Sequence, residues 1–280
     1  MTRVAVLIPC FDDGALTAEA VASVREDEPV EIVVIDDASS DPETLAVLGE
    51  LERAGVTVAR HDDNRGVGEA RMTGLAASSA PFVFPLDSDD LAVPGSLAAM
   101  ADVLDADPGA AVCFGDYDEF GESTVARAVP ARLDPYRLAY INEYPVSSLF
   151  RRSWLGRVGG WRGGGYTGRS YEDWNLWMGL AEAGARGLHA GPEVIAYRRR
   201  LHGQRKLQAG KRRHRELYRQ LRAAHPQLFA EVGAHRRASD LPPARRLLYP
   251  VVYGARRRFP WEARLKALLD RAGVWTLRRD

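Results

Sequence analysis

The chain has 280 residues, of which 46% are hydrophobic and 27% charged, so it can form a packed core and does not have the composition of a disordered protein. This length fits one large α/β domain, or one domain with a smaller appendage. The net charge is zero, but residues 1–194 hold 15 Lys and Arg against 32 Asp and Glu, and residues 195–280 hold 23 against 6.

The N-terminal segment MTRVAVLIPCFDDG lacks the apolar stretch and small-residue cleavage site of a signal peptide. No window approaches the roughly 18 apolar residues of a transmembrane helix. The two cysteines, Cys10 and Cys113, lie far apart in apolar runs, which predicts buried thiols and no disulfide framework. Together these features predict a cytoplasmic protein.

Four apolar runs alternate with helical stretches in the first third of the chain. Strands are predicted over 3–8, 30–35, 56–60 and 81–86, and helices over 14–27, 42–54 and 66–79. Asp41 and Pro42 are a good N-cap and first residue for the second helix. Alternation of this kind is typical of a parallel sheet covered on both faces, with all strand C-termini along one ligand-binding edge. The predicted fold class is α/β.

The rest of the chain is less regular. Further elements are predicted as a helix over 94–106, a strand over 110–115, a strand over 146–151 and a helix over 172–184. The stretch from 116 to 144 is polar and predicts no element, and 159–168 is a glycine-dense loop. From residue 195 the sequence becomes basic, and further on its pattern is helical.

Two candidate contacts for a nucleotide follow the first two strands. Asp36 and Asp37 end the second strand, where a carboxylate can accept a hydrogen bond from a nucleobase or a ribose hydroxyl, although Asp is also common in turns and caps. Phe11 follows the first strand, and its ring could stack on a base, although a lone aromatic residue is more often part of a core.

Three carboxylates, those of Asp87, Asp89 and Asp90, fall within four positions at the end of the fourth strand. They repel one another and are tolerated best with a cation between them. Oxygen ligands suit Mg²⁺ or Mn²⁺, and either cation could neutralise a departing diphosphate. An EF-hand is excluded, because the segment lacks Gly and Glu at the required positions. The alternative is a solvated turn.

Glu172 and Asp173 begin a predicted helix directly after the glycine-dense loop. A helix N-terminus favours carboxylates, so ordinary capping explains the pair equally well. A general base would have to lie within hydrogen-bond reach of an acceptor hydroxyl.

Taken in order, VAVLIPCFDDG, VVIDDASSD, NRGVGEARMTGL, PLDSDD, the glycine loop and YEDWNLWMGL resemble the GT-A fold family 2 glycosyltransferases, which are inverting enzymes. The resemblance implies a Rossmann-like fold with a mixed, mainly parallel sheet and a catalytic domain over 1–203. This domain would comprise a nucleotide-binding half (1–92) and an acceptor-binding half (93–203), followed by a basic helical extension (204–280). It also implies sugar transfer from a nucleotide-diphosphate donor, most often a UDP-sugar, to an acceptor hydroxyl with Mn²⁺ or Mg²⁺.

The resemblance assigns roles residue by residue. Phe11 stands where the family has a base-stacking Tyr, and Asp37 would bond the base. Asp87 and Asp89 match the family's DxD motif, with Asp89 the direct metal ligand. The donor-binding residues implied are Pro9, Phe11, Asp37, Arg71, Asp87 and Ser88, the metal-binding residues are Asp87, Asp89 and His202, and the catalytic base is Asp173.

This sequence departs from the family at Phe11-Asp12, where a Tyr-Asn pair is usual. Arg71 would lie near the diphosphate and donor sugar, and a surface arginine is the alternative. The glycines at 163–165 either let the acceptor-side loop move over the donor or make a tight turn.

Arginine clusters flanked by large apolar residues mark the C-terminal region from 211 onward. Docking on the acidic body or on a second subunit is one interpretation, and contact with an anionic membrane surface at the inner face is another. No nucleic-acid-binding module accompanies the charge, so nucleic acid is not an expected partner. The expected partners are a nucleotide-sugar and an acceptor that is a glycan, a lipid-linked sugar or a small molecule.

Three rival functions are disfavoured by the sequence. A sugar-nucleotide pyrophosphorylase would carry a glycine-rich, basic phosphate loop after the first strand, and PCFDDG is not one. A Rossmann dehydrogenase would need G-x-G-x-x-G at the same place. A nucleotide-sugar-binding protein without transferase activity is disfavoured by the carboxylates of Asp87, Asp89 and Asp173.

Overall fold

The computed structural model describes residues 2–201, 213–254 and 268. A seven-stranded sheet has the order β10-β6-β9-β4-β1-β2-β3, and a second sheet has the order β5-β11-β7-β8. The strands are β1 Val4–Cys10, β2 Val30–Asp36, β3 Thr57–Arg60, β4 Phe82–Pro85, β5 Leu91–Ala92, β6 Ala110–Phe114, β7 Asp116–Gly121, β8 Val125–Arg127, β9 Leu149–Arg151, β10 Arg186–His189 and β11 Ile195–Leu201.

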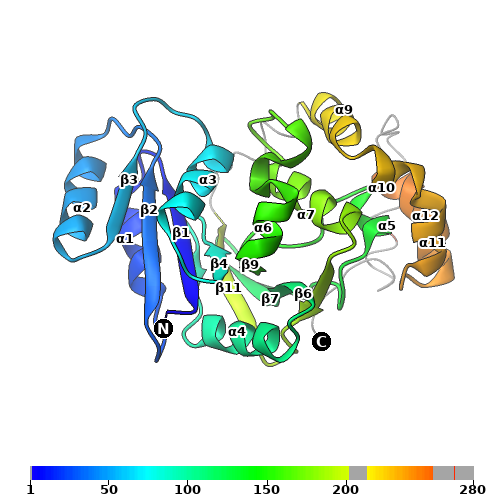
Figure 1. Cartoon of the computed structure of the whole chain (residues 1–280), viewed down its shortest axis with the longest axis horizontal. Coiled ribbons are helices and arrows are strands. Elements are labelled where there is room, and N and C mark those ends of the chain that lie inside the picture. Colours follow the sequence, from blue (N-terminus) through cyan, green and yellow to red (C-terminus); the bar gives the residue numbers. More distant parts are fainter. Residues whose placement is uncertain (1, 202–212, 255–267, 269–280) are drawn as a thin grey trace.

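Helices cover both faces of the large sheet (Figure 1). They are α1 Gly14–Ser23, α2 Pro42–Arg53, α3 Val67–Ala77, α4 Ser96–Ala106, α5 Pro135–Leu138, α6 Arg152–Val158, α7 Glu172–Glu182, α9 His214–Ala224, α10 Pro226–Ala230, α11 Val232–Ala238 and α12 Pro243–Tyr253, with a 3-10 helix at Gly160–Gly165. In Figure 1, α3, α6 and α7 lie above the sheet and α4 lies below it.

Strand β1 is the centre of the first half of the fold, and all seven of its residues are buried. It pairs in parallel with β2 and with β4. Its side chains alternate between two cores, because successive residues of a strand point to opposite faces: Leu7 packs in the cluster that includes Ala70 of α3, and Ile8 in the one that includes Leu97 of α4. Gly74 lets α3 approach the sheet, since a Cβ there would lie 2.7 Å from Ile35 Cδ1.

The strands and helices predicted before residue 107 are all present, with ends shifted by a few residues. The predicted N-cap is also confirmed, because Asp41 accepts a hydrogen bond from Thr44 N at 2.9 Å. Strand β9 is shorter than predicted and runs antiparallel to β4 and β6, so the sheet is mixed. Cys10 and Cys113 are buried and free, as predicted.

The polar stretch 116–144 was wrongly expected to hold no element, since it contains β7, β8 and α5. Strand β7 pairs in parallel with β11, a segment about 80 positions further along. Side chains join this second sheet: Tyr117 stacks on Tyr197 with ring centroids 5.0 Å apart, and Glu119 is paired with Arg127 and Arg199.

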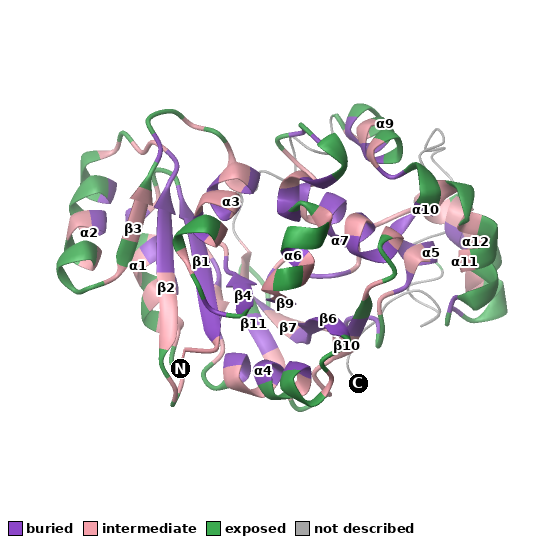
Figure 2. Cartoon of the chain, viewed as in Figure 1, coloured by how far each residue is buried: buried purple, intermediate pink, exposed green. Residues whose placement is uncertain are grey.

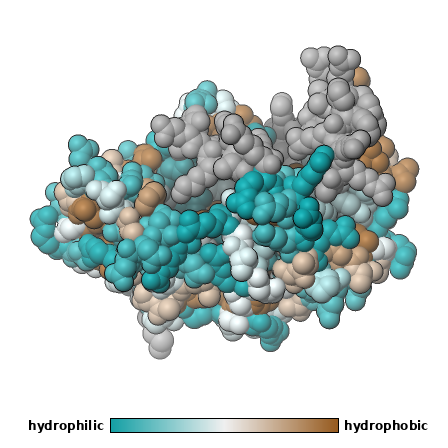
Figure 3. Space-filling view, turned by 90° about the horizontal axis from the view of Figure 1, so that it is seen from above, coloured by the Kyte–Doolittle hydropathy of each residue, from teal (hydrophilic) through white to brown (hydrophobic). Residues whose placement is uncertain are grey.

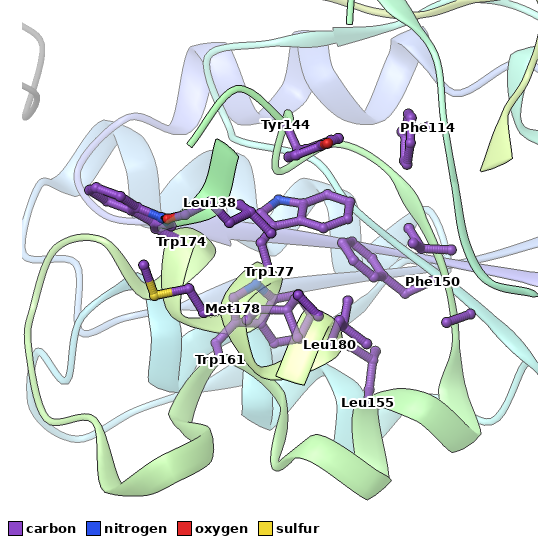
Figure 4. Packing of buried hydrophobic residues seen from close by; sticks show 14 of the residues in the cluster. Phe114, Leu138, Tyr144, Phe150, Leu155, Trp161, Trp174, Trp177, Met178 and Leu180 are labelled. Carbon is purple, nitrogen blue, oxygen red and sulfur yellow. The ribbon is translucent and has the colours of Figure 1, made fainter. Parts of the chain in front are cut away.

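An aromatic core fills the second half of the fold (Figure 4). Trp177 of α7 lies 5.1 Å from the ring of Tyr144, 5.3 Å from Phe150 and 5.9 Å from Phe114. Trp161 is buried beside them. These rings come from five separate segments, so the core joins α7, the 3-10 helix, β6, β9 and the loop that carries Tyr144.

The basic C-terminal region packs on the body over 213–254, where α9, α10 and α12 each bury residues while α11 buries none (Figure 2). His225 Nδ1 lies 3.0 Å from Glu182 Oε2, and His225 Nε2 lies 2.9 Å from Asn175 Oδ1, both on α7. Tyr249 of α12 donates to Glu143 at 2.6 Å. Intramolecular docking is therefore observed for this part of the region.

Hydrophilic side chains predominate on the face of the described residues seen in Figure 3. None of the helices in the described ranges is long and apolar enough to cross a membrane.

Candidate active site

The site is built at the C-terminal ends of β1, β2 and β4, where Phe11 is 39% exposed. Pro9 is buried inside β1, opposite Ile35 of β2. Asp12 has a left-handed backbone with φ of 52°, and its Oδ1 accepts hydrogen bonds from Ser40 N at 2.7 Å and Asp41 N at 2.9 Å. These hydrogen bonds to Asp12 join the loop after β1 to the loop after β2.

Asp37 is buried, and both of its carboxylate oxygens are engaged with the loop before α3. Oδ1 accepts from Arg65 N at 2.8 Å and lies 2.7 Å from His61 Nδ1, while Oδ2 accepts from Gly66 N at 2.7 Å. Asp37 therefore shapes this loop, and its contact with a nucleobase stays a prediction.

The carboxylates of Asp87, Asp89 and Asp90 meet at the end of β4, with one oxygen of each lying within 4.8 Å of the others. Asp87 and Asp89 are half-buried, whereas Asp90 is buried and accepts from Arg200 N at 2.8 Å. Burial, followed by the charges of Asp87 and Asp89, holds the pKa of Asp90 well above its ordinary value. A bound cation would relieve this repulsion, and an all-oxygen ligand set fits Mg²⁺ or Mn²⁺.

Ser88 lies within this turn, and its hydroxyl donates to Asp13 Oδ2 at 2.6 Å. Since Asp13 follows β1, this bond joins the loop after β4 to the loop after β1. The predicted role of Ser88 toward the donor stays a prediction.

Arg71 of α3 links the two halves of the site. It is only 2% exposed, so it is not a surface arginine. Its Nη2 donates to Asp87 Oδ1 at 2.6 Å and its Nη1 to Glu172 Oε1 at 3.0 Å. The guanidinium also lies over the ring of Trp161, 5.8 Å from its centroid. One buried cation therefore bridges the carboxylate group at β4 and the start of α7.

Asp173 lies in the first turn of α7 and is half-buried. The residue before the helix, Tyr171, has a φ of 68°, a conformation that is uncommon for a residue other than glycine and is found preferentially at functional sites. Burial raises the pKa of both Asp173 and Glu172, and the positive charge of Arg71 opposes the rise.

The glycine-dense loop is a packed turn. Gly163 fits so tightly that a Cβ there would lie 1.9 Å from Val158 O, and its own carbonyl accepts from Asn175 Nδ2 at 3.1 Å. Arg162 pairs with Glu69 of α3 at 2.8 Å. Of the two interpretations of these glycines, the structure favours the tight turn.

The sequence predicted Glu172 only as one of two carboxylates at the start of a helix, and it did not single out Asn142. Glu172 is the partner of Arg71, and Asn142 Nδ2 donates to Asp173 Oδ2 at 3.0 Å. Glu172 is next to Asp173 in the motif, so a role for it could have been predicted from the sequence. Nothing in the sequence marks Asn142. His202 lies outside the described residues, although the strand before it ends at this site, with Arg200 Nε donating to Asp89 O at 3.0 Å.

Comparison with known proteins matches residues 5–159 to the sequence profile of Glycosyl transferase family 2. Succinoglycan biosynthesis protein ExoU of Rhizobium meliloti (strain 1021) is 36% identical over 101 residues, which are 35% of this chain and 30% of that protein. Poly(ribitol-phosphate) beta-N-acetylglucosaminyltransferase TarP of Staphylococcus aureus (strain N315) is 33% identical over 96 residues, 32% of this chain and 29% of that protein. The aligned parts thus span about a third of these relatives.

Two solved structures share the fold. S. aureus TarS 1–349 in complex with UDP-GlcNAc superposes with a TM-score of 0.65 at 18% identity, covering 88% of this chain and 69% of that one. Mannosyltransferase PcManGT from Pyrobaculum calidifontis, in complex with GDP-Man and Mn²⁺, gives a TM-score of 0.56 at 20% identity, covering 98% of this chain and 81% of that one. Both likenesses establish the fold of this chain as GT-A-like.

Proposed function

Because the chain belongs to glycosyl transferase family 2, we propose that it transfers a sugar from a nucleotide-diphosphate donor to an acceptor hydroxyl, with a divalent cation bound at the end of β4. The observation that carries this proposal is the bridge made by Arg71, because it gathers Asp87 and the Glu172-Asp173 pair into one site. A cation-binding group and a candidate base then face the same donor.

The cation would be held by Asp87 and Asp89, with Asp90 behind them. When bound, it would neutralise the negative charge that develops on the departing diphosphate. Support for a divalent metal comes from the arrangement of the three carboxylates and from the Mn²⁺ in the complex of PcManGT.

Asp173 is the proposed general base. Its carboxylate takes the proton from the acceptor hydroxyl, whose oxygen forms a bond to the anomeric carbon of the donor sugar. The bond from that carbon to the diphosphate oxygen breaks, and its electron pair leaves with the diphosphate. A single displacement of this kind inverts the anomeric centre and needs no covalent enzyme intermediate.

We take residues 1–92 as the donor half and residues 93–203 as the acceptor half. Phe11 at the end of β1 would stack on the base, and Asp37 would contact it. A UDP-sugar is proposed because the likeness to TarS includes its complex with UDP-GlcNAc. An acceptor in glycan synthesis is supported by the likeness to ExoU.

The proposal is tested by incubating the protein with a panel of UDP-, dTDP- and GDP-sugars, with Mn²⁺ or with a chelator, and measuring release of the nucleoside diphosphate. We expect turnover of one donor, and its loss on chelation. Tight binding of a donor without turnover in any combination would instead identify a binding protein. Formation of a nucleotide-sugar from a nucleoside triphosphate and a sugar phosphate would identify a pyrophosphorylase.

A further inference from the structure

The carboxylate of Asp173 has one neutral side chain as a close partner, and that side chain belongs to a segment outside the motifs. Asn142 lies between α5 and β9, and its Nδ2 donates to Asp173 Oδ2 at 3.0 Å. The two residues are 31 positions apart. The family resemblance assigns Asn142 no role, because it is not among the motif residues.

The orientation of the Asn142 amide is fixed by a second hydrogen bond. Tyr144 N donates to Asn142 Oδ1 at 3.1 Å. Only the oxygen of an amide can accept that bond, so the NH₂ group must be the end that faces Asp173. The interaction with Asp173 is therefore a donor acting on a carboxylate, which favours the ionised form.

The segment that carries Asn142 is rigidly anchored. Tyr144 is buried, with its ring 5.3 Å from Phe114 and 5.1 Å from Trp177. Its hydroxyl donates to Arg132 O at 2.7 Å and accepts from Asp134 N at 2.8 Å. A side chain held in this way keeps a fixed place relative to α7, since Trp177 lies on the same helix as Asp173.

We propose that Asn142 is a positioning residue that holds Oδ2 of Asp173, so that the other carboxylate oxygen is aimed at the acceptor hydroxyl. This inference rests on the proposed function, in which Asp173 is the base. A base whose carboxylate can rotate spends only part of its time in the reactive geometry, and small misplacements of a catalytic group are costly in rate.

The hydrogen bond from Asn142 also offsets the burial and the negative charge that disfavour the ionised form of Asp173. Burial and the charge of Asp87 at the end of β4 raise the pKa of Asp173, whereas the backbone N–H of Trp174, the charge of Arg71 on α3 and the amide of Asn142 lower it; Glu172 and Tyr166 are the other titratable groups that interact with it. Loss of the hydrogen bond from Asn142 would destabilise the ionised form of Asp173 and so raise its pKa. A base must be ionised to work, so the acid limb of its pH–rate profile would then move to higher pH.

The test compares Asn142→Ala with Glu143→Gln in the full-length protein. Glu143 is the next residue, and it accepts from Arg137 at 2.9 Å and from Tyr249, so its change perturbs the same segment without touching Asp173. For Asn142→Ala we expect kcat to fall by about 10- to 100-fold, the donor KM to stay unchanged, and the acid limb of kcat to move upward. Glu143→Gln should leave kcat and its pH profile unchanged.

An unchanged kcat and acid limb in Asn142→Ala would overturn the proposal, and so would an equal loss of kcat in Glu143→Gln. Failure of the proposal about Asn142 can be told from failure of the proposed function. The proposed function fails only if the wild-type protein turns over no donor.

Discussion

The two proposed halves of the site, the donor half and the acceptor half, are held by different kinds of contact. After β1 and β2, the carboxylates of Asp12 and Asp37 accept backbone N–H groups from neighbouring loops. At the start of α7, Asp173 and Glu172 are held by side chains, those of Asn142 and Arg71, that lie 31 and 101 positions away. Sheet topology therefore sets the first arrangement, whereas individual side chains set the second.

This difference predicts where substitutions act. Single substitutions in the acceptor half should strongly alter the rate or the stability. Each carboxylate at the start of α7 is held by one side chain, so its loss is not made up by a second contact. The loops after β1 and β2 should be more tolerant, because several backbone bonds hold them.

The largest effect is expected for Asp173→Asn. Removal of the base should lower kcat by about 10²- to 10⁴-fold, while the dissociation constant of the donor stays unchanged, because the base acts on the acceptor. Steady-state kinetics and donor titration measure the two quantities. Asp27→Asn, an exposed change at a distance from the site, is the matched control and should match the wild type. A donor affinity that falls together with kcat would place Asp173 in donor binding instead.

Arg71→Met is expected to cost about 3–5 kcal/mol of unfolding free energy, because it leaves the buried Glu172 and the half-buried Asp87 without their cation. Chemical denaturation measures the loss. Adding Glu172→Gln to the first change should recover part of it, since one uncompensated carboxylate is then removed. A loss of less than about 1 kcal/mol, as for an exposed ion pair, would show that this bridge does not hold the halves together.

Gly163→Ala distinguishes the two interpretations of the glycine-dense loop, a packed turn and a mobile loop. The added methyl group would clash with Val158 O, so we expect a loss of about 1–3 kcal/mol in unfolding free energy. Gly156→Ala is the control, because Gly156 is helical and a Cβ added there would meet nothing within 4 Å; it should be neutral or stabilising by up to about 1 kcal/mol. Equal effects at the two positions would favour the mobile loop.

The smallest effect is a pH dependence of stability at the contact between α7 and the C-terminal helices. Burial lowers the pKa of His225 below its ordinary value of about 6.5. The unfolded chain therefore takes up a proton before the folded chain does, so stability is full above about pH 6.5 and falls as the pH drops toward the lower folded-state pKa. Denaturation of the wild type and His225→Gln between pH 7.5 and 5.5 tests this, and identical slopes would contradict it.

The same difference explains what the sequence could predict. The elements of the donor half follow from apolar runs and turn residues, and the carboxylates of Asp87, Asp89 and Asp90 were placed together because they lie within four positions at the end of one strand. The second sheet was missed because β7 is polar and finds its partner, β11, far along the chain. A strand that is stabilised by such pairing gives little signal in its own sequence.

In the acceptor half of the site, too, contacts between distant segments could not be predicted from the sequence. Asp173 was predicted as the base through the family motif, but its hydrogen-bond partner Asn142 lies in a stretch without any motif. The burial of Arg71 was also not predictable, since a helix with an arginine in mid-sequence is usually solvated on that face. Both facts depend on contacts across the fold.

We propose that carboxylates from both halves act on one metal-bound donor. The most direct test of this proposal is the thermal stabilisation of the protein by the donor that is turned over, with Mn²⁺ or a chelator, in the wild type, Asp89→Asn and Asp173→Asn, because a ligand stabilises in proportion to its binding. We expect a Mn²⁺-dependent rise in Tm that is lost in Asp89→Asn and kept in Asp173→Asn. A rise that is the same with the chelator and in Asp89→Asn would contradict the proposal.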